Sequence, residues 1–133
     1  MNNLFIKSTE YTPDIFFDAD KHILEITGVS RPENVTEYYS PIIDWMTTYE
    51  SVLYKNHVSG GKKETIHLIF KFSYFNSASS KMIYTLLDSL TRIKEMGYPI
   101  HIDWYSEIGD DQMHEDGEEL SEAIDVPFNF FEH

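Results

Sequence analysis

Residues 65–96 read TIHLIFKFSYFNSASSKMIYTLLDSLTRIKEM, and this stretch determines the fold. Its first part alternates strictly, with apolar residues at Ile66, Leu68, Phe70, Phe72 and Tyr74. Apolar groups also occur on the opposite face, so we expect a central strand that is mostly buried on both sides. After a serine-rich turn at residues 76–80, apolar residues recur at helical spacing until Gly97, a typical C-cap. The stretch thus predicts a strand that runs through a serine-rich turn into a helix.

The serine-rich turn lies where the predicted helix presents the free backbone N–H groups of its first turn. The helix macrodipole favours negative charge at that end, so a phosphate on one of these serines would be stabilised. Serines ahead of a helix ordinarily act as N-caps, which is the main alternative to a functional serine. The Gly-x-Ser-x-Gly pattern of hydrolase nucleophiles does not surround them. Capping and modification therefore both remain open.

The composition predicts one compact domain that spans residues 1–133. The chain is 41% hydrophobic, which is enough for a real core, and it is too short for two ordinary domains. It has no cysteine, which excludes disulfides, thiolate catalysis and cysteine-based zinc sites. Because the N-terminus does not resemble a signal peptide and no stretch is apolar enough to span a bilayer, we expect a cytoplasmic protein.

The net charge of −13 is unevenly distributed along the chain. Twelve Asp and Glu residues follow Lys94, without a single Lys or Arg. Such a field repels nucleic acid and anionic lipid, so we expect neither as a partner. The acidic region either attracts a basic protein surface or is simply a well-solvated face.

The rest of the chain alternates between short strands and helices. Further strands are predicted at residues 4–6, 14–18, 22–27, 100–105 and 126–131, and further helices at residues 34–53 and 109–124, with a turn at residues 28–34. The predicted strands at residues 14–18 and 22–27 form an antiparallel hairpin. Strands separated by helices pair in parallel through right-handed crossovers. We therefore expect a mixed, mostly parallel α/β sheet with an N-terminal antiparallel hairpin and three helices.

The two further helices have different expected stabilities. In the first, Asn34 is the expected N-cap, and an apolar stripe keeps its phase across Pro41, which favours one continuous unit that is bent or kinked. The stripe, expected to pack on the sheet, contains Tyr38, Ile42, Trp45, Met46, Tyr49, Val52 and Leu53. The second helix is acidic and contains Gly117, so it is expected to be the least stable element.

Metal, acid–base and nucleotide chemistry have little support in the sequence. No histidine has a second ligand at the spacing of zinc helices, although His67 and His101 lie on neighbouring predicted strands and could meet. Asp103 and Glu107 are candidates for acid–base work by position, but a solvated acidic face explains them better. Gly60-Gly61 is not followed by Lys-Ser/Thr at the spacing of a Walker phosphate-binding loop. We expect no metal, no cofactor and no enzymatic activity.

Several short motifs resemble the SiaC family of bacterial regulatory phosphoproteins in order and spacing. They are Thr12-Pro13, Arg31-Pro-Glu-Asn34, Pro41-Ile-Ile-Asp-Trp45, Tyr74-Phe-Asn-Ser-Ala-Ser-Ser-Lys81, Gly97-Tyr-Pro99 and Val126-Pro-Phe128. The resemblance covers nearly the whole chain. It implies a fold similar to the STAS domains of anti-sigma-factor antagonists, in which a phosphorylated Ser or Thr lies where a strand meets a helix.

The resemblance also implies a function and a site. In the family, the acceptor is phosphorylated by a partner kinase and dephosphorylated by a PP2C-type phosphatase, and the unmodified protein binds and stimulates a diguanylate cyclase. The acceptor maps onto Ser77, with Ser79 and Ser80 as alternatives because a Thr is expected there and Ala78 occupies a position that is often hydroxylated. The implied partner-binding residues are Asn76, Ser77, Ala78, Ser79, Ser80 and Lys81.

Overall fold

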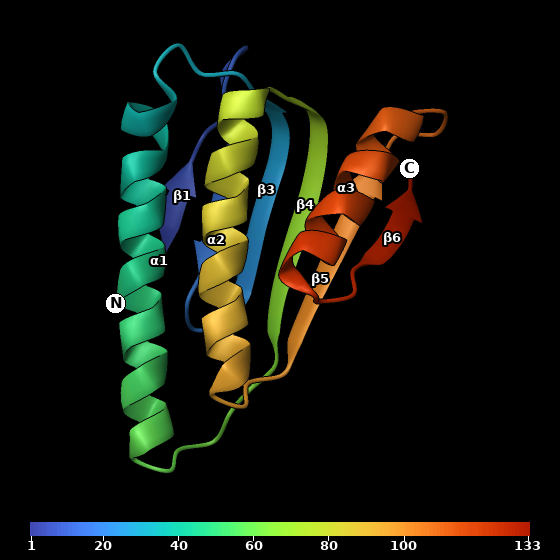
Figure 1. Cartoon of the computed structure of the whole chain (residues 1–133). Coiled ribbons are helices and arrows are strands. Elements are labelled where there is room, and N and C mark those ends of the chain that lie inside the picture. Colours follow the sequence, from blue (N-terminus) through green and yellow to red (C-terminus); the bar gives the residue numbers. More distant parts are fainter.

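The computed structural model describes residues 1–133, which form six strands and three helices (Figure 1). In chain order they are β1 (Leu4–Ile6), β2 (Asp14–Asp18), β3 (Ile23–Ser30), α1 (Val35–Val58), β4 (Ile66–Phe75), α2 (Ser77–Glu95), β5 (Ile100–Ser106), α3 (Asp111–Ile124) and β6 (Asn129–Glu132). The strands form one sheet in the order β1-β2-β3-β4-β5-β6. β1, β2 and β3 pair antiparallel, and β3 to β6 pair in parallel. The expected mixed α/β fold is confirmed.

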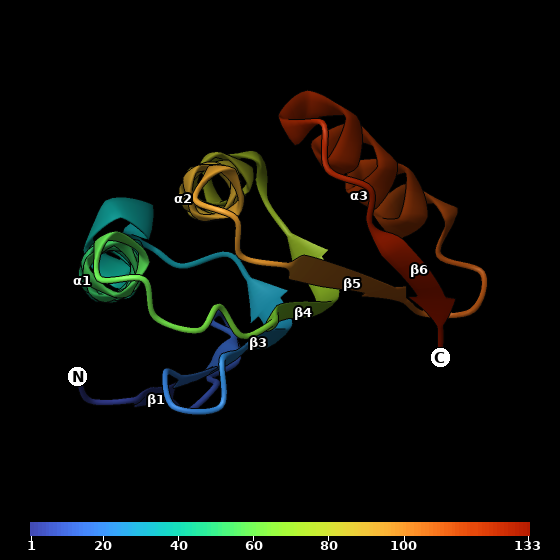
Figure 2. The ribbon, with the colours of Figure 1, turned by 90° about the horizontal axis from the view of Figure 1, so that it is seen from below.

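All three helices lie on one side of the sheet (Figure 2). This arrangement follows from the strand order, because right-handed crossovers that always step in the same direction place every helix on the same face. The expectation that β4 is buried on both sides is therefore wrong. Ile66, Leu68, Phe70 and Phe72 face the helices and are buried, whereas His67, on the other side, is exposed.

β3 extends further than expected. Its last three residues, 28–30, are the beginning of the turn that the sequence predicts at residues 28–34. The strand continues through Gly28, at φ +115°, to Ser30, because parallel pairing with β4 stabilises an extended backbone that local turn signals do not favour. The register shifts between Gly28 and Val29, where β4 has one extra residue. Beyond this bulge Tyr74 turns away from the core and is 50% exposed, which corrects its expected burial.

α1 is one helix that includes Pro41, with Asn34 as its N-cap, as the sequence predicts. The Asn34 side chain accepts a hydrogen bond from the Glu37 amide at 3.0 Å. The buried residues of α1 are Tyr39, Ile42, Trp45, Met46, Tyr49 and Leu53. Val52 is expected among them but is 43% exposed, while Tyr38 is only half-buried and Tyr39 takes the core position. The buried stripe therefore begins one residue later than expected and is narrower at its end.

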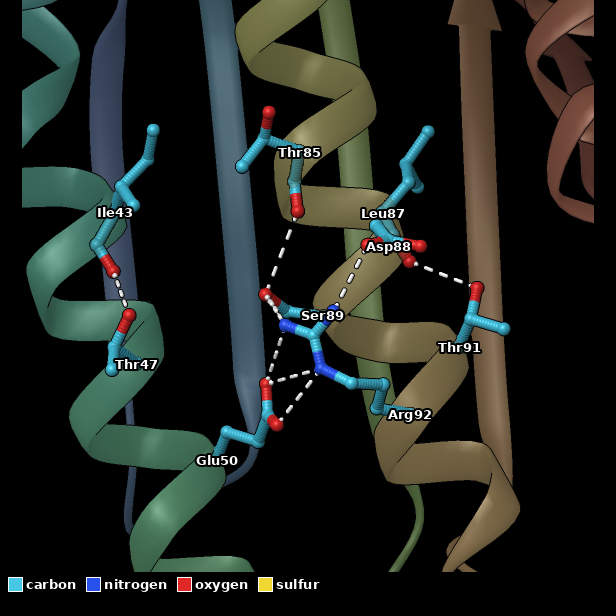
Figure 3. A network of polar contacts seen from close by, with 9 residues as sticks. All are labelled: Ile43, Thr47, Glu50, Thr85, Leu87, Asp88, Ser89, Thr91 and Arg92. Atoms are coloured by element: carbon cyan, nitrogen blue, oxygen red, sulfur yellow. Dashed lines mark hydrogen bonds and ion pairs between the residues drawn. The ribbon is translucent and has the colours of Figure 1, made fainter.

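An arginine connects α1 and α2 on their outer surfaces (Figure 3). The Arg92 guanidinium donates to the Glu50 carboxylate through Nε at 3.0 Å and Nη2 at 2.9 Å, and to Asp88 through Nη1 at 2.9 Å. The hydrogen bonds to Glu50, followed by the nearby negative charges, raise the pKa of Arg92. The pair keeps the two helices in register over their C-terminal halves.

α3 is present, and its glycine has a packing role that the sequence does not reveal. Gly117 is buried against Trp104, and a Cβ there would lie 2.6 Å from the indole. The Trp104 Nε1 donates to the Met113 carbonyl at 2.9 Å, so glycine allows the helix to approach the ring closely. The last strand, β6, starts only at Asn129 and not at the expected residue 126. Val126 and Phe128 pack into the core before the strand begins to pair with β5.

Candidate functional site

The junction between β4 and α2 lies at the edge of the sheet where the parallel strands end. Asn76 is the N-cap of α2, and its side chain accepts a hydrogen bond from the Ser79 amide at 2.8 Å. The Asn76 amide donates to the Ser30 carbonyl at 3.1 Å, which fixes the junction to the end of β3. The Ser80 amide donates to the Asn76 carbonyl at 3.0 Å. The amides of Ser77 and Ala78 are left without an acceptor in the chain.

The serines belong to the first turn of α2 and do not precede it, which corrects the expected turn at residues 76–80. Asn76, not a serine, caps the helix, and the Ser77 hydroxyl has no hydrogen-bond partner in the chain. Helical geometry separates the side chains. Ser77, Ala78 and Lys81 are exposed, Ser80 is half-buried, and Ser79 is fully buried at 0% exposure.

Ser79 takes part in a buried chain of hydroxyl groups. Its Oγ donates to the Ser30 carbonyl at 3.0 Å and accepts from the Ser30 Oγ at 2.9 Å. The Tyr39 hydroxyl lies 2.6 Å from the same Ser30 Oγ. Because the Ser30 hydroxyl has only one proton and gives it to Ser79, Tyr39 is the donor to Ser30. The start of α2 is thus connected to β3 and to α1.

Sequence reasoning missed both Ser30 and Tyr39. It places Ser30 in a turn, and it favours Tyr38 over its neighbour Tyr39. One signal for Tyr39 was available, because Tyr39, Ile42, Met46 and Tyr49 follow helical spacing as well as the stripe that starts at Tyr38. No local signal identifies Ser30, since its partner lies 49 residues away in the sequence.

Tyr39→Phe is expected to lower the free energy of unfolding by about 0.5–1.5 kcal/mol at neutral pH, because a buried hydrogen bond is lost. Burial raises the pKa of the Tyr39 phenol above its ordinary 10.0, although the hydrogen bonds with Ser30 and Ser79 act in the opposite direction. The phenol then contributes full stability below about pH 10 and loses it as the pH rises towards the folded-state pKa. Urea unfolding at about pH 7 and about pH 11 should therefore show a smaller penalty at the higher pH.

The exposed Tyr84 provides the control for that measurement. Tyr84→Phe should leave the unfolding free energy unchanged at both pH values, within about 0.5 kcal/mol. A Tyr39→Phe protein as stable as the wild type at neutral pH would contradict the role given to the hydroxyl chain.

A hollow of about 220 Å³ lies between the start of α2 and α3. Its lining comprises Phe75, Ser80, Asp116, Glu119, Leu120 and Ala123. Ser80 therefore faces two carboxylates of the acidic helix, and a negative group added there would be repelled by them. Ser77 is not among the lining residues and has the unpaired amides beside it.

The remaining candidate side chains do not form a second site. His67 and His101 do meet across β4 and β5, with ring centroids 5.3 Å apart. No group of three or more His, Cys, Asp or Glu residues is placed to hold a metal ion. Asp103 accepts a hydrogen bond from Asn129, and Glu107 is exposed in the following loop. No helix combines the length and apolar character needed to cross a membrane.

Comparison with known proteins gives consistent relatives. At the sequence level, residues 6–133 match the family described as SiaC family regulatory phosphoprotein. An uncharacterized protein of Pseudomonas aeruginosa strain UCBPP-PA14 is 28% identical over 128 residues, which cover 96% of this chain and 94% of that protein.

Solved structures agree with the sequence match. Apo-SiaC from Pseudomonas aeruginosa superposes with a TM-score of 0.82 at 27% identity, covering 98% of this chain and 99% of that one. The structure of the diguanylate cyclase SiaD in complex with its activator SiaC, from the same organism, contains a chain that matches with a TM-score of 0.83 at 27% identity and the same coverage. On the family match over nearly its full length, this chain belongs to the SiaC family of regulatory phosphoproteins.

Proposed function

We propose that this chain is a non-catalytic switch protein that is controlled by reversible phosphorylation of Ser77. In the unmodified form it binds and activates a diguanylate cyclase, and in the phosphorylated form it releases that enzyme. A cognate protein kinase adds the phosphate, and a PP2C-type phosphatase removes it. The docking surface for these partners includes the accessible residues at the start of α2, namely Asn76, Ser77, Ala78, Ser80 and Lys81. Ser79, which the sequence also suggests as a partner-binding residue, is fully buried and is not part of this surface.

The observation that carries the proposal is the difference between the three serines. Ser77 is exposed and its hydroxyl is free, whereas Ser79 is buried and bonded to Ser30. A kinase reaches Ser77 without disturbing the helix, but reaches Ser79 only if the start of α2 opens. Because Asn76 already caps the helix, capping does not account for Ser77. Ser80 faces carboxylates and is the weaker alternative.

A phosphate on Ser77 can change partner binding without unfolding the protein. Phosphorylation adds about −1.5 to −2 charges at neutral pH. At the first position of α2, the free amides of Ser77 and Ala78, the helix dipole and the exposed Lys81 can accept that charge, so the fold is preserved. A partner that docks on this turn would instead meet a strongly hydrated dianion. Burying it without a new cation is costly, and the complex dissociates.

The choice of a diguanylate cyclase as output rests on the relatives. The SiaC of Pseudomonas aeruginosa is described as the activator of the diguanylate cyclase SiaD and is found in complex with it. The matching chain of that complex shares this fold over 98% of the present chain. This supports an output partner of the same class here.

The experiment compares wild-type, Ser77→Ala, Ser77→Asp and Ser80→Ala proteins as baits in extracts of the host. Recovered proteins are assayed for diguanylate cyclase activity. Intact mass of the native protein, with and without phosphatase, detects the phosphate, and mass spectrometry of its peptides locates the modified residue. We expect Ser77→Ala and Ser80→Ala to recover the cyclase, and Ser77→Asp to recover at least about tenfold less, a difference of about 1.4 kcal/mol in binding. All four proteins should have similar melting temperatures.

Two outcomes would contradict the proposal in different ways. Equal recovery by Ser77→Ala and Ser77→Asp would favour the alternative, a constitutive protein-interaction domain without a switch. A phosphate mapped to Ser80 would retain the switch and displace its site, and recovered partners without cyclase activity would reject the output.

A further inference from the structure

The face of the sheet opposite the helices is uncovered (Figure 2). Parallel sheets normally have both faces covered, because their strands are joined by crossovers and carry apolar side chains on both sides. Here β3 to β6 are parallel, yet all three crossover helices lie on the other side. Large apolar residues are correspondingly exposed on the open face, with Phe5 at 59%, Phe16 at 43% and Phe131 at 42%.

The side chains of this open face have a symmetric arrangement. At one edge, Phe5 of β1 stacks on Phe16 of β2 with centroids 4.8 Å apart. At the other edge, Tyr105 of β5 stacks on Phe131 of β6 at 4.9 Å. The two central strands, β3 and β4, carry an ion pair in which the Lys71 Nζ lies 3.4 Å from the Glu25 Oε1. An aromatic pair, an ion pair and a second aromatic pair thus follow one another across the sheet.

The open face carries little of the net charge. Its exposed and half-buried charged residues are two lysines and three carboxylates, which leaves −1 of the total −13: Lys7, Lys71, Asp14, Glu25 and Asp103. By contrast, α3 contains six Asp and Glu residues and lies on the opposite side of the sheet. Two copies can therefore approach through their open faces while their acidic helices point away from each other.

We propose that the open face binds a second copy of this chain in a two-fold symmetric dimer, with the axis parallel to the strands and between β3 and β4. This rotation places β1 over β6, β2 over β5 and β3 over β4 of the partner. Phe5 and Phe16 then meet the aromatic pair of the other copy, and the Glu25 carboxylate of each copy meets a lysine of the other. The face is thus complementary to itself, as a two-fold interface requires.

The expected area makes the dimer weak and reversible. Six strands about 4.8 Å apart span about 24 Å, and strands that average about six residues extend over about 20 Å, so each copy offers about 500 Å². The total of about 1,000 Å² is at the lower limit of biological interfaces. The aromatic pair on β5 and β6 lies two residues further along the strand direction than the pair on β1 and β2, a shift of about 7 Å. The usual angle of about 30° between packed sheets accommodates this shift.

The decisive experiment mixes two charge-reversal variants in sedimentation equilibrium of the full chain. Glu25→Lys and Lys71→Glu each break the ion pair within their own chain and place like charges across a symmetric dimer. In a mixed dimer, the introduced lysine of one copy meets the introduced glutamate of the other, and the native Lys71 meets the native Glu25. We expect each variant alone to dimerise at least about tenfold more weakly than the wild type, and their equimolar mixture to recover to within about threefold of it. No intramolecular effect produces such recovery.

Further variants test the face itself. Phe16→Lys should weaken dimerisation at least about tenfold, whereas Tyr84→Lys, on the outer surface of α2 and equally 43% exposed, should not. Since the chain has no cysteine, Thr27→Cys gives one thiol near the proposed axis, and a bis-maleimide of about 10 Å should link two copies. Thr85→Cys on α2 should remain unlinked. Raising the salt from about 0.02 M to about 0.5 M should strengthen the dimer by screening the net charge.

The proposal is overturned if the wild type is monomeric at about 1 mM, a concentration that detects even weak association, or if the mixture is as monomeric as its components. A dimer that is disrupted by Tyr84→Lys and not by Phe16→Lys would place the contact on the helices and reject the open face. These measurements require neither kinase nor cyclase, so they are independent of the Ser77 switch.

Discussion

Ser79→Asp is expected to lower the free energy of unfolding by about 3–5 kcal/mol, whereas Ser77→Asp should change it by less than about 0.5 kcal/mol. The two residues lie in the same helical turn and receive the same charge. At Ser79 the carboxylate is fully buried, loses the hydrogen bond that Ser79 donates to the Ser30 carbonyl, and lies against that oxygen. At Ser77 it stays in water beside free amides, where a helix favours negative charge.

Urea unfolding of the purified proteins measures the difference, with the alanine variants as matched controls. Ser79→Ala loses only the hydroxyl and should cost about 1–2 kcal/mol, and Ser77→Ala should be neutral. If Ser79→Asp were as stable as the wild type, the start of α2 would open readily, and Ser79 would again be a candidate acceptor. The comparison therefore separates the two serines by stability alone, without any partner.

Local patterns were sufficient for the element order, the cap of α1 and the parallel pairing. The strand that ends at Phe75 and the helix that follows it are visible in the alternation and the helical spacing of their apolar residues. The burial of β4 on one side only was not visible, because simple alternation assigns Ile69 and Phe75 to the face opposite Ile66 and so predicts apolar residues on both faces. Which face the helices cover depends on the direction of every crossover, and thus on the order of the whole sheet.

The local structure of the junction between β4 and α2 was predicted wrongly. A run of serines indicates capping, so the helix was expected to begin after them, yet Asn76 caps it one residue before Ser77. The distinction between Ser77 and Ser79 depends on which side of the first turn faces β3. That orientation is fixed by Ser30 and Tyr39, both remote in the sequence. Local sequence patterns therefore could not separate the serines of this segment.

Gly117 shows a similar limit of local reasoning. A glycine within a helix usually lowers its stability by about 1 kcal/mol relative to alanine, which made α3 the weakest expected element. In the structure this glycine is what allows α3 to lie against Trp104, where a Cβ would be 2.6 Å from the ring. Its cost to the isolated helix is offset by contact with a residue on β5, which no pattern within α3 reveals.

Trp104→Ala is expected to lower the free energy of unfolding by about 3–5 kcal/mol and to release α3 from the sheet. The indole is fully buried among aromatic rings, with Phe70 at 5.2 Å and Phe128 stacked on it at 5.9 Å. It also holds α3 directly, by the hydrogen bond to the Met113 carbonyl and by contact with Gly117. Its removal leaves a large cavity beneath α3 and removes the hydrogen bond to the Met113 carbonyl. Native-state amide exchange should therefore become faster in α3 than in α1 and α2.

Trp45→Ala is the matched control for this effect. Trp45 is also buried, stacks on Tyr49 with centroids 5.0 Å apart and donates to the Asn2 carbonyl at 2.7 Å, but it lies on α1. Its removal should cost a similar amount of global stability, about 3–5 kcal/mol, while α3 keeps its protection relative to the rest of the chain. If both variants gave the same exchange pattern, α3 would unfold only together with the whole protein. In that case Trp104 would be an ordinary core residue, and α3 would not be an element that a partner binding at the edge of the sheet could stabilise or release separately.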